Sequence, residues 1–327
     1  MKRKFDVQAF GALIAFVVVF AAAAITSLCL DEGVFLRSGN LLNILRQVSY
    51  TGIIGIGMTF VLLAGGIDLS VGSLTALSGG LAILAMNALD QRFPYLAERP
   101  WTLVALGILA GVAAGAAGGA INGALVSVGR VVPFIATLGT MSIFRSLALF
   151  FSGAGEFKSN VDAFADFGMG YWLGLPTPVW AFLLLAALAS LLLHGTRFGR
   201  HVLAVGANER VATFAAISVP RIRFATYVLS GISVGVAASL LSARMNSISS
   251  TTGGLNYELD AIAAVIIGGT SMSGGRGTVW GTVLGAIILG IVNNMLNLVG
   301  VSPYLQNAAK GLVIICAVLV QRPAAKA

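Results

Sequence analysis

Charged residues are scarce in this sequence. Asp, Glu, Lys and Arg make up 10% of its 327 residues, whereas apolar residues make up 57%. A soluble globular domain carries about 25% charged residues, which help to cover its surface. Because this chain has too few polar side chains for that purpose, its expected solvent is lipid. The composition argues against a soluble protein and predicts an integral membrane protein.

Cysteine and histidine are also scarce, with two of each. Cys29 and Cys316 both lie in apolar runs. A disulfide framework is therefore not expected, and both residues are interpreted as small buried side chains. The four residues do not cluster along the chain, which leaves no zinc or iron site.

Several catalytic and energy-coupling motifs are missing. The sequence has no phosphate-binding loop of the pattern G-x-x-x-x-G-K-[ST], no H-E-x-x-H motif and no nucleophile elbow. It also has no series of acidic residues through its apolar runs that would carry protons. The chain is therefore expected to be no enzyme and to bind no cofactor. If it pumps a substrate, another subunit must supply the energy.

Long apolar runs, by contrast, are abundant, and crossing a bilayer takes about 20 such residues. Ten runs qualify as candidates: Phe10–Leu30, Leu45–Ala64, Ser70–Leu89, Trp101–Val128, Val132–Phe151, Val179–His194, Phe224–Met245, Leu259–Gly269, Thr278–Leu298 and Pro303–Gln321. The run Leu259–Gly269 is too short alone, so it is expected to begin earlier or to be a broken helix. The first run is longer than the ~7–15 residues of a signal-peptide core and is expected to be retained. The sequence predicts an all-α, polytopic bundle of about ten transmembrane helices, with residues 1–327 forming one domain.

The distribution of Lys and Arg indicates an orientation. With a cytoplasmic N-terminus and alternating spans, the inside segments hold 12 of these residues and the outside segments 5, including Arg46. Arg145, Arg244 and Lys310 lie within the predicted helices. Membrane proteins carry an excess of positive charge on the cytoplasmic side. Both termini are therefore expected in the cytoplasm.

Glycines recur every four residues in two regions. The series are Gly107, Gly111, Gly115, Gly119 and Gly123, and then Gly277, Gly281 and Gly285. Residues four apart share one face of a helix, and small residues let a second helix approach closely. Each series is therefore expected to form a helix face that receives a neighbouring helix.

A short internal repeat is also visible. The segment Val61–Gly66 resembles Val265–Gly269, and each leads through a polar stretch into another glycine-rich helix. Repeated halves are common in transporters. In a sequence this rich in glycine, chance is the alternative explanation.

The longest inside segment, Thr196–Arg223, contains the pattern of a short helix outside the bilayer. Asn208 is a good N-cap residue, and Glu209 lies in the first turn, where an acid is favourable. Pro220 is expected to end this helix. One face would carry Val211, Phe214, Ala215 and Ser218. The segment is either a basic loop resting on anionic lipid headgroups or a docking element for a cytoplasmic partner.

Two charged residues interrupt apolar surroundings. Asp68 is either an intramembrane charge with a transport role or a turn residue at the inner surface. Its position just after Gly65 and Gly66 favours the turn. Arg145 is the best candidate for a buried structural or pathway charge, whereas Arg244 is expected to reach the membrane interface.

Five asparagines form the candidate translocation path: Asn122, Asn246, Asn293, Asn294 and Asn297. Their neutral amides suit a path for polyhydroxylated substrates. Hydrogen bonds between helices would use the same side chains equally well, so both interpretations stay open.

Four long motifs occur in a fixed order along the chain: Gly65–Ser73, Phe198–Asn208, Tyr257–Ser271 and Gly274–Thr282. Together they resemble the ribose, xylose, arabinose and galactose permeases of ATP-binding-cassette (ABC) importers. The resemblance extends from Leu41 to Val320, and its structural motif residues are Gly65, Gly66, Asp68, Gly268 and Gly269. One departure is Ala216, where the family usually has glycine before the isoleucine.

The resemblance implies the ABC importer permease fold in a bacterial inner membrane. Two copies of the chain would form a path for a monosaccharide, with ribose favoured and other pentoses, hexoses or inositols as alternatives. A separate ATPase that uses ATP and Mg would dock on the coupling loop 196–223, and a periplasmic protein would deliver the sugar. The implied coupling residues are Asn208, Glu209, Val211, Phe214 and Ile217. Alternating access by rigid groups of helices is the implied mechanism, and no nucleic acid is involved.

Two other functions are weighed against this one. A self-sufficient, gradient-driven carrier or channel would need ion-coupling acids buried in the membrane, and only Asp68 is a candidate. A polytopic membrane enzyme would need His, Asp or Cys residues clustered near an interface, and none cluster.

Overall fold

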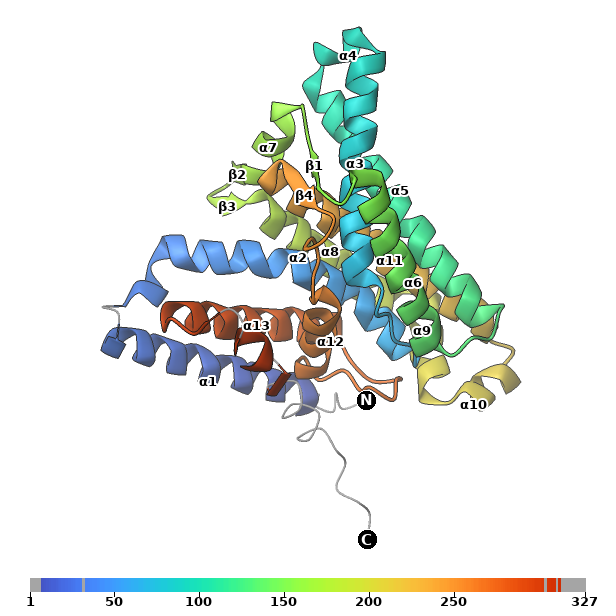
Figure 1. The fold of residues 1–327 in the computed structure, drawn as a ribbon. Helices are drawn as coiled ribbons and strands as arrows, with labels where there is room; N and C mark the ends of the chain where they lie inside the picture. Colours follow the sequence, from blue (N-terminus) through green and yellow to red (C-terminus); the bar gives the residue numbers. More distant parts are fainter. Residues whose placement is uncertain (1–6, 31–32, 303–304, 310, 313–327) are drawn as a thin grey trace.

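The structure is a computed structural model that describes residues 7–30, 33–302, 305–309 and 311–312 as a bundle of helices (Figure 1). The helices are α1 (Val7–Leu30), η1 (Val34–Leu36), α2 (Ser38–Leu63), α3 (Val71–Arg92), α4 (Pro94–Ala97), α5 (Pro100–Ser127), α6 (Pro133–Ser152), α7 (Asp162–Met169), α8 (Thr177–Gly195), α9 (Arg197–Ala207), α10 (Glu209–Phe214), α11 (Val219–Met245), α12 (Tyr257–Ile267) and α13 (Val279–Leu298). Strand β1 (Glu156–Lys158) pairs antiparallel with β4 (Ser247–Ser249). Strand β2 (Tyr171–Trp172) pairs antiparallel with β3 (Leu175–Pro176).

Eight of the described helices are long and apolar enough to cross a membrane, namely α1, α2, α3, α5, α6, α8, α11 and α13. They coincide with eight of the ten predicted runs, which confirms the polytopic helical class. The run at 259–269 forms α12, which has 11 residues and begins at Tyr257. At 1.5 Å per residue α12 is about 16 Å long, too short to cross alone. Most of the run Pro303–Gln321, with Lys310 and Cys316, lies outside the described residues.

The predictions made for Arg46, Pro220 and Cys29 are wrong. Arg46 was expected in an outside segment, but α2 begins at Ser38 and therefore includes this residue. Its side chain is buried, with 8% exposed. Pro220 lies in the first turn of α11 and does not end the preceding helix. Proline suits the first turn because the amide it lacks would have no helical partner there. Cys29, interpreted as buried, is exposed on α1.

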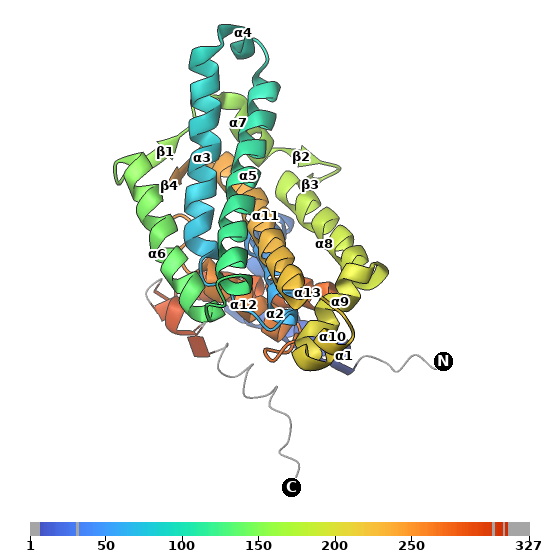
Figure 2. The ribbon, with the colours of Figure 1, turned by 90° about the vertical axis from the view of Figure 1, so that its right-hand side faces the viewer.

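Helix α11 lies at the centre of the bundle, packed along α5 and also against α2 and α3. Figure 2 shows α3, α5 and α11 side by side. Figure 1 shows α1, α13 and α2 as a second group that crosses the first, and α12 packs against both α2 and α13. The buried apolar side chains of these elements form the main core.

Both glycine faces receive a neighbouring helix, as predicted. A Cβ atom at Gly115 would collide with the carbonyl oxygen of Gly231 on α11, and one at Gly123 would lie 2.9 Å from the carbonyl oxygen of Phe224. On α13, Gly281 and Gly285 lie against the backbone of α12. The third member of that series, Gly277, lies in the loop before α13 and was wrongly assigned to the helix.

The internal repeat has a structural counterpart in the ends of α2 and α12. Each helix is followed by a glycine with positive φ, 76° at Gly65 and 89° at Gly269. The next amide then bonds back to a carbonyl five residues earlier, Gly66 N to Val61 O at 2.9 Å and Thr270 N to Val265 O at 3.1 Å. This is the hydrogen-bond pattern of a glycine-terminated helix. The two helices therefore end in the same turn, and each turn leads toward another long helix.

Segments expected on the same side of the membrane contact one another. Gly275 N donates to Leu63 O at 3.0 Å, which joins the loop before α13 to the end of α2. At the other end, β1 pairs with β4, and the Asn87 side chain of α3 donates to Lys158 O at 2.8 Å. The short α12 and its flanking loops therefore connect the two groups of segments.

Candidate functional site

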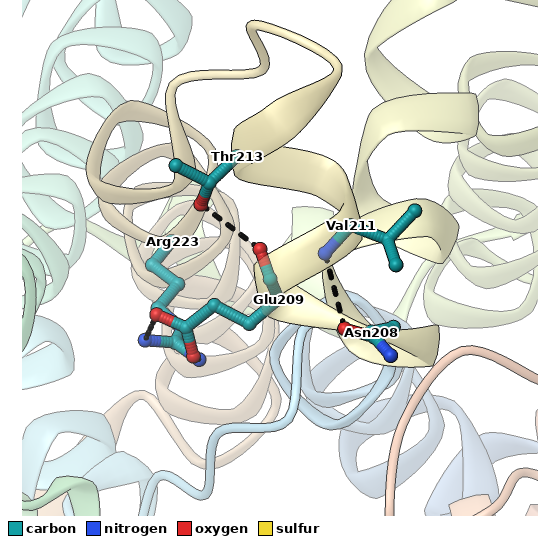
Figure 3. A network of polar contacts seen from close by, with 5 residues as sticks. All are labelled: Asn208, Glu209, Val211, Thr213 and Arg223. Carbon is teal, nitrogen blue, oxygen red and sulfur yellow. Dashed lines mark hydrogen bonds and ion pairs between the residues drawn. The ribbon is translucent and has the colours of Figure 1, made fainter.

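The predicted coupling loop forms two helices, α9 and α10, joined at Asn208. The Asn208 side chain caps α10 by accepting a hydrogen bond from Val211 N at 3.1 Å (Figure 3). Glu209 forms an ion pair of 2.7 Å with Arg223 of α11. The cap fixes the start of α10, and the ion pair ties it to α11. The predicted helix start is therefore present with the geometry that its sequence indicates.

Two apolar side chains of α10 face outward. Val211 is 61% exposed and Phe214 is 91% exposed, whereas Ala212 is buried against the bundle. Ile217 follows the helix, is half-buried and packs against the core. The cap and the ion pair to α11 therefore hold two apolar side chains in an exposed position. The helix ends at Phe214, so Ala215 and Ser218 do not extend its face as predicted.

The end of α10 has a backbone conformation that favours glycine at position 216. Ala216 has φ of 58°, in the left-handed region that favours glycine. Ile217 N bonds to Ala212 O and Ala216 N to Thr213 O, each at 3.0 Å. Alanine therefore occupies a helix-terminating position whose backbone conformation favours glycine.

The coupling loop touches the rest of the bundle through backbone at Gly206. A Cβ atom there would collide with the carbonyl oxygen of Leu63 and lie 2.5 Å from Gly275 N. Gly206 is two residues before the cap of α10. The end of α2, the end of α9 and the loop before α13 therefore meet at one junction, with no side chain between them.

Asp68 is fully buried and makes the turn that sequence reasoning favoured. Its Oδ1 accepts hydrogen bonds from Ser70 N at 3.0 Å and Ser70 Oγ at 2.7 Å. Asn122 of α5 and Ser230 of α11 also donate to its carboxylate, at 3.4 and 3.3 Å. The turn is enclosed by α5 and α11, so it is buried within the bundle. Asp68 holds together helices far apart in the sequence.

Arg145 is held by backbone. Its Nη1 donates to Ser250 O at 2.8 Å and to Gly253 O at 3.0 Å, in the segment between β4 and α12. The side chain therefore anchors that segment to α6. This contact favours the structural reading of Arg145.

The five candidate path asparagines do not converge. Asn122 belongs to the Asp68 cluster and also accepts a bond from Thr140 Oγ1 at 2.6 Å. Asn294 exchanges two hydrogen bonds with Asn40 of α2, at 2.8 and 3.0 Å. Asn297 donates to Asn293 O at 3.0 Å, and Asn246 terminates α11 with φ of 49°. Asn293 lines a cavity between α2, α11, α12 and α13.

Sequence reasoning did not connect two groups of residues. One is the set around Asp68, in which Ser230 and Tyr227 of α11 meet the turn after α2. The other is the cavity beside Asn293, which is built by four helices. In the described part of the chain, no cluster of three or more His, Cys, Asp or Glu residues could hold a metal ion.

Comparison with known proteins identifies the relatives of this chain. The family described as "Branched-chain amino acid transport system / permease component" matches residues 40–318. The ribose import permease protein RbsC of Bacillus subtilis is 45% identical over 88% of this chain and 86% of its own length. Its Escherichia coli K12 counterpart is 42% identical, with the same coverage of each chain. The L-arabinose transport system permease protein AraH of Escherichia coli K12 is 36% identical over 97% of this chain and 92% of its own length.

No solved structure matches the chain. The family match covers more than four-fifths of the residues, and the relatives align along nearly their whole length. The chain belongs to the permease component family of branched-chain amino acid transport systems.

Proposed function

We propose that this chain is the membrane permease of an ABC importer. We propose further that its substrate is a monosaccharide, and ribose is the sugar that we favour. The observation that carries the proposal is the capped helix α10, which holds Phe214 91% exposed beside the bundle. Relatives named for ribose import are 40–45% identical over most of the chain, which favours that sugar. Relatives named for L-arabinose and D-allose are each 36% identical, so they make those sugars alternatives.

Three kinds of partner follow from this function. A separate cytoplasmic ATPase, which hydrolyses ATP with Mg, docks on α10; this chain itself carries no ATPase site. A periplasmic protein delivers the sugar, and a second copy of the chain completes the path. The sequence has no phosphate-binding loop, in keeping with an energy source on another subunit.

We further propose that both termini and α10 lie in the cytoplasm. The excess of Lys and Arg in the segments on that side supports this arrangement. Movement of α10 on ATP binding would reach α2 and the loop before α13 through the Gly206 junction. Rigid groups of helices would then expose the path alternately to the two sides.

Reconstitution tests the function. The purified chain is placed in liposomes and labelled ribose uptake is measured, first alone and then with its ATPase, its sugar-binding protein and ATP. Uptake is expected in the full mixture only. Uptake by the chain alone, or uptake driven by an ion gradient, would make it a carrier or channel instead.

Two substitutions test the docking surface. Val211→Asp with Phe214→Asp is expected to reduce uptake at least tenfold, because it places charges on the face that meets the ATPase. Tyr95→Asp on α4, also at an exposed position, serves as the control and is expected to transport normally. Insertion and yield should be equal in all three proteins. Normal uptake by the double variant would remove α10 from the coupling role.

A further inference from the structure

Four helices line an open cavity of about 310 Å³. Gln47 and Tyr50 come from α2, Arg244 from α11, Tyr257 and Asp260 from α12, and Asn293 from α13. Its volume is at the lower end of the range for small-molecule sites, roughly 300–1,000 Å³. The cavity therefore fits a small ligand, and it lies between α2, α11, α12 and α13.

Two polar atoms at this cavity lack hydrogen-bond partners among the described residues. Tyr50 is 2% exposed and its hydroxyl is unpartnered, as is the buried Oδ1 of Asn293. Arg244 is near enough to act on the Tyr50 hydroxyl electrostatically, although no hydrogen bond of ordinary geometry joins them. Buried polar groups in native proteins are nearly always bonded, so two exceptions at one cavity need an explanation. A bound molecule that supplies hydroxyl groups would satisfy both.

The chemistry of the wall matches a neutral polyhydroxylated molecule. Arg244 and the amide of Gln47 can donate hydrogen bonds, while Asp260 and Asn293 Oδ1 can accept them. Each sugar hydroxyl both donates and accepts, so mixed surroundings of this kind suit it. The rings of Tyr50 and Tyr257 add apolar surface for the carbon skeleton. One cation and one anion balance each other, which gives no preference for a charged ligand.

The cavity lies toward one end of the molecule. Arg244 is in the last turn of α11, just before β4, and Tyr257 begins α12. These ends belong to the group of segments opposite the Gly206 junction and α10. In the proposed orientation, the cavity is therefore in the periplasmic half of the chain.

We propose that this cavity is a sugar-holding site within each copy of the permease. It takes up the monosaccharide before the helices move in response to ATP. The inference rests on the proposed function and deepens it, because it names the residues that contact the substrate. Tyr50 and Asn293 supply the two unpartnered atoms, and Gln47 lies exposed at the mouth.

Thiol protection tests binding without relying on transport. Gln47→Cys is made in a Cys29→Ser, Cys316→Ser background, assembled with the ATPase and the binding protein, and modified with a small thiol reagent. Saturating D-ribose is expected to slow modification at least threefold, and betaine at the same concentration is the control solute. Adding Tyr50→Phe should raise the ribose concentration that gives half-maximal protection about three- to tenfold, because it deletes only the hydroxyl group and so one hydrogen bond.

Uptake provides the second measurement. Tyr50→Phe and Asn293→Leu should each lower the maximal ribose uptake rate about three- to tenfold, the effect of one lost hydrogen bond. Stimulation of ATP hydrolysis by the binding protein should be unchanged. Tyr95→Phe makes the same change at an exposed site and should transport normally.

The outcomes separate the inference from the function on which it rests. If the assembly imports ribose but modification of Gln47→Cys is equally fast with and without it, the cavity holds only water and the inference is wrong. If the unmodified assembly imports no ribose, the proposed substrate fails instead. Protection by L-arabinose or D-allose would then support the cavity, and lack of protection by every sugar would overturn it.

Discussion

Ala216 adopts a backbone conformation that costs alanine more than glycine. Its φ of 58° places the Cβ close to the following carbonyl, a cost of about 1–2 kcal/mol for an L-residue. The helix end is nevertheless formed, with hydrogen bonds from Ala216 N and Ile217 N. The rest of α10 and its ion pair to α11 therefore hold this residue in place. A strained residue beside the exposed face of α10 makes that end of the helix easier to open.

Ala216→Gly is accordingly expected to stabilise the end of α10. Relief of the left-handed strain, less the added flexibility of the unfolded chain, leaves a gain of about 0.5–1 kcal/mol. Hydrogen exchange of the Ile217 amide should slow about two- to fivefold. Ala215→Gly is the matched control, because Ala215 has φ of −81° and glycine there should leave exchange equal or faster.

Arg145 provides a second prediction about a single residue. Arg145→Ala removes the donors of two carbonyl groups, Ser250 O and Gly253 O. Hydrogen bonds to charged groups contribute about 1.5–3 kcal/mol each, so unfolding should become easier by at least about 2 kcal/mol. Thermal unfolding in detergent measures the loss. Arg92→Ala, at the exposed end of α3, should stay within about 0.5 kcal/mol of the unmodified protein.

Arg244→Ala should behave differently from Arg145→Ala. Arg244 lines the cavity and makes no such backbone anchor, so its loss should lower uptake more than stability. Equal and mild effects of both substitutions on both measurements would make the two residues simple surface anchors.

At the scale of elements, the bundle depends on helices whose backbones touch. On α5, Gly115 and Gly119 lie directly against Gly231 and Tyr227 of α11. Two such helices cannot separate by a fraction of an ångström without losing the contacts along their length. The pair is therefore expected to move as one rigid body when the permease changes state.

Gly115→Leu tests this packing. The added side chain has no space and must push α5 and α11 apart, and overpacking of this kind costs at least about 1–3 kcal/mol. The yield of folded protein and its thermal unfolding temperature in detergent should both fall. Gly11→Leu on α1 is the matched control, because no atom lies within 4 Å of a Cβ built there. Equal stability of the two variants would show that α5 and α11 are not in close contact.

The sequence predicts the elements of this fold better than its site. Hydropathy and glycine spacing are local patterns, so α5 and its partner face could be expected from residues 107–123 alone. Pro220 could not be placed, because proline is compatible with both the end of one helix and the start of the next. The cavity could not be expected either. Tyr50, Arg244 and Asn293 each look like single polar residues in apolar helices, and only the convergence of α2, α11 and α13 brings them together.

At the scale of the whole molecule, the chain has two opposite groups of connecting segments. One contains the end of α2, Gly206 and the loop before α13. The other contains β1, β4 and the end of α3. Most of the helices that join one group to the other are long enough to cross a membrane. Helix α12 is the exception, since its 11 residues cover only about half of a bilayer core of about 30 Å.

The position of residue 272 therefore decides the topology. If α12 and its flanking loops carry the chain across, Met272 and Glu156 must face opposite sides of the membrane. Single-cysteine variants Met272→Cys and Glu156→Cys, in a Cys29→Ser, Cys316→Ser background, are treated in spheroplasts with a thiol reagent that cannot cross the membrane. Glu156→Cys should react at once, and Met272→Cys only after permeabilisation, because both residues are exposed on the protein surface. The opposite pattern would invert the proposed orientation and place α10 outside the cell, where no ATPase could reach it. Reaction of both from one side would mean that the chain turns back at α12, and the cytoplasmic junction of Gly206 with Gly275 could not exist.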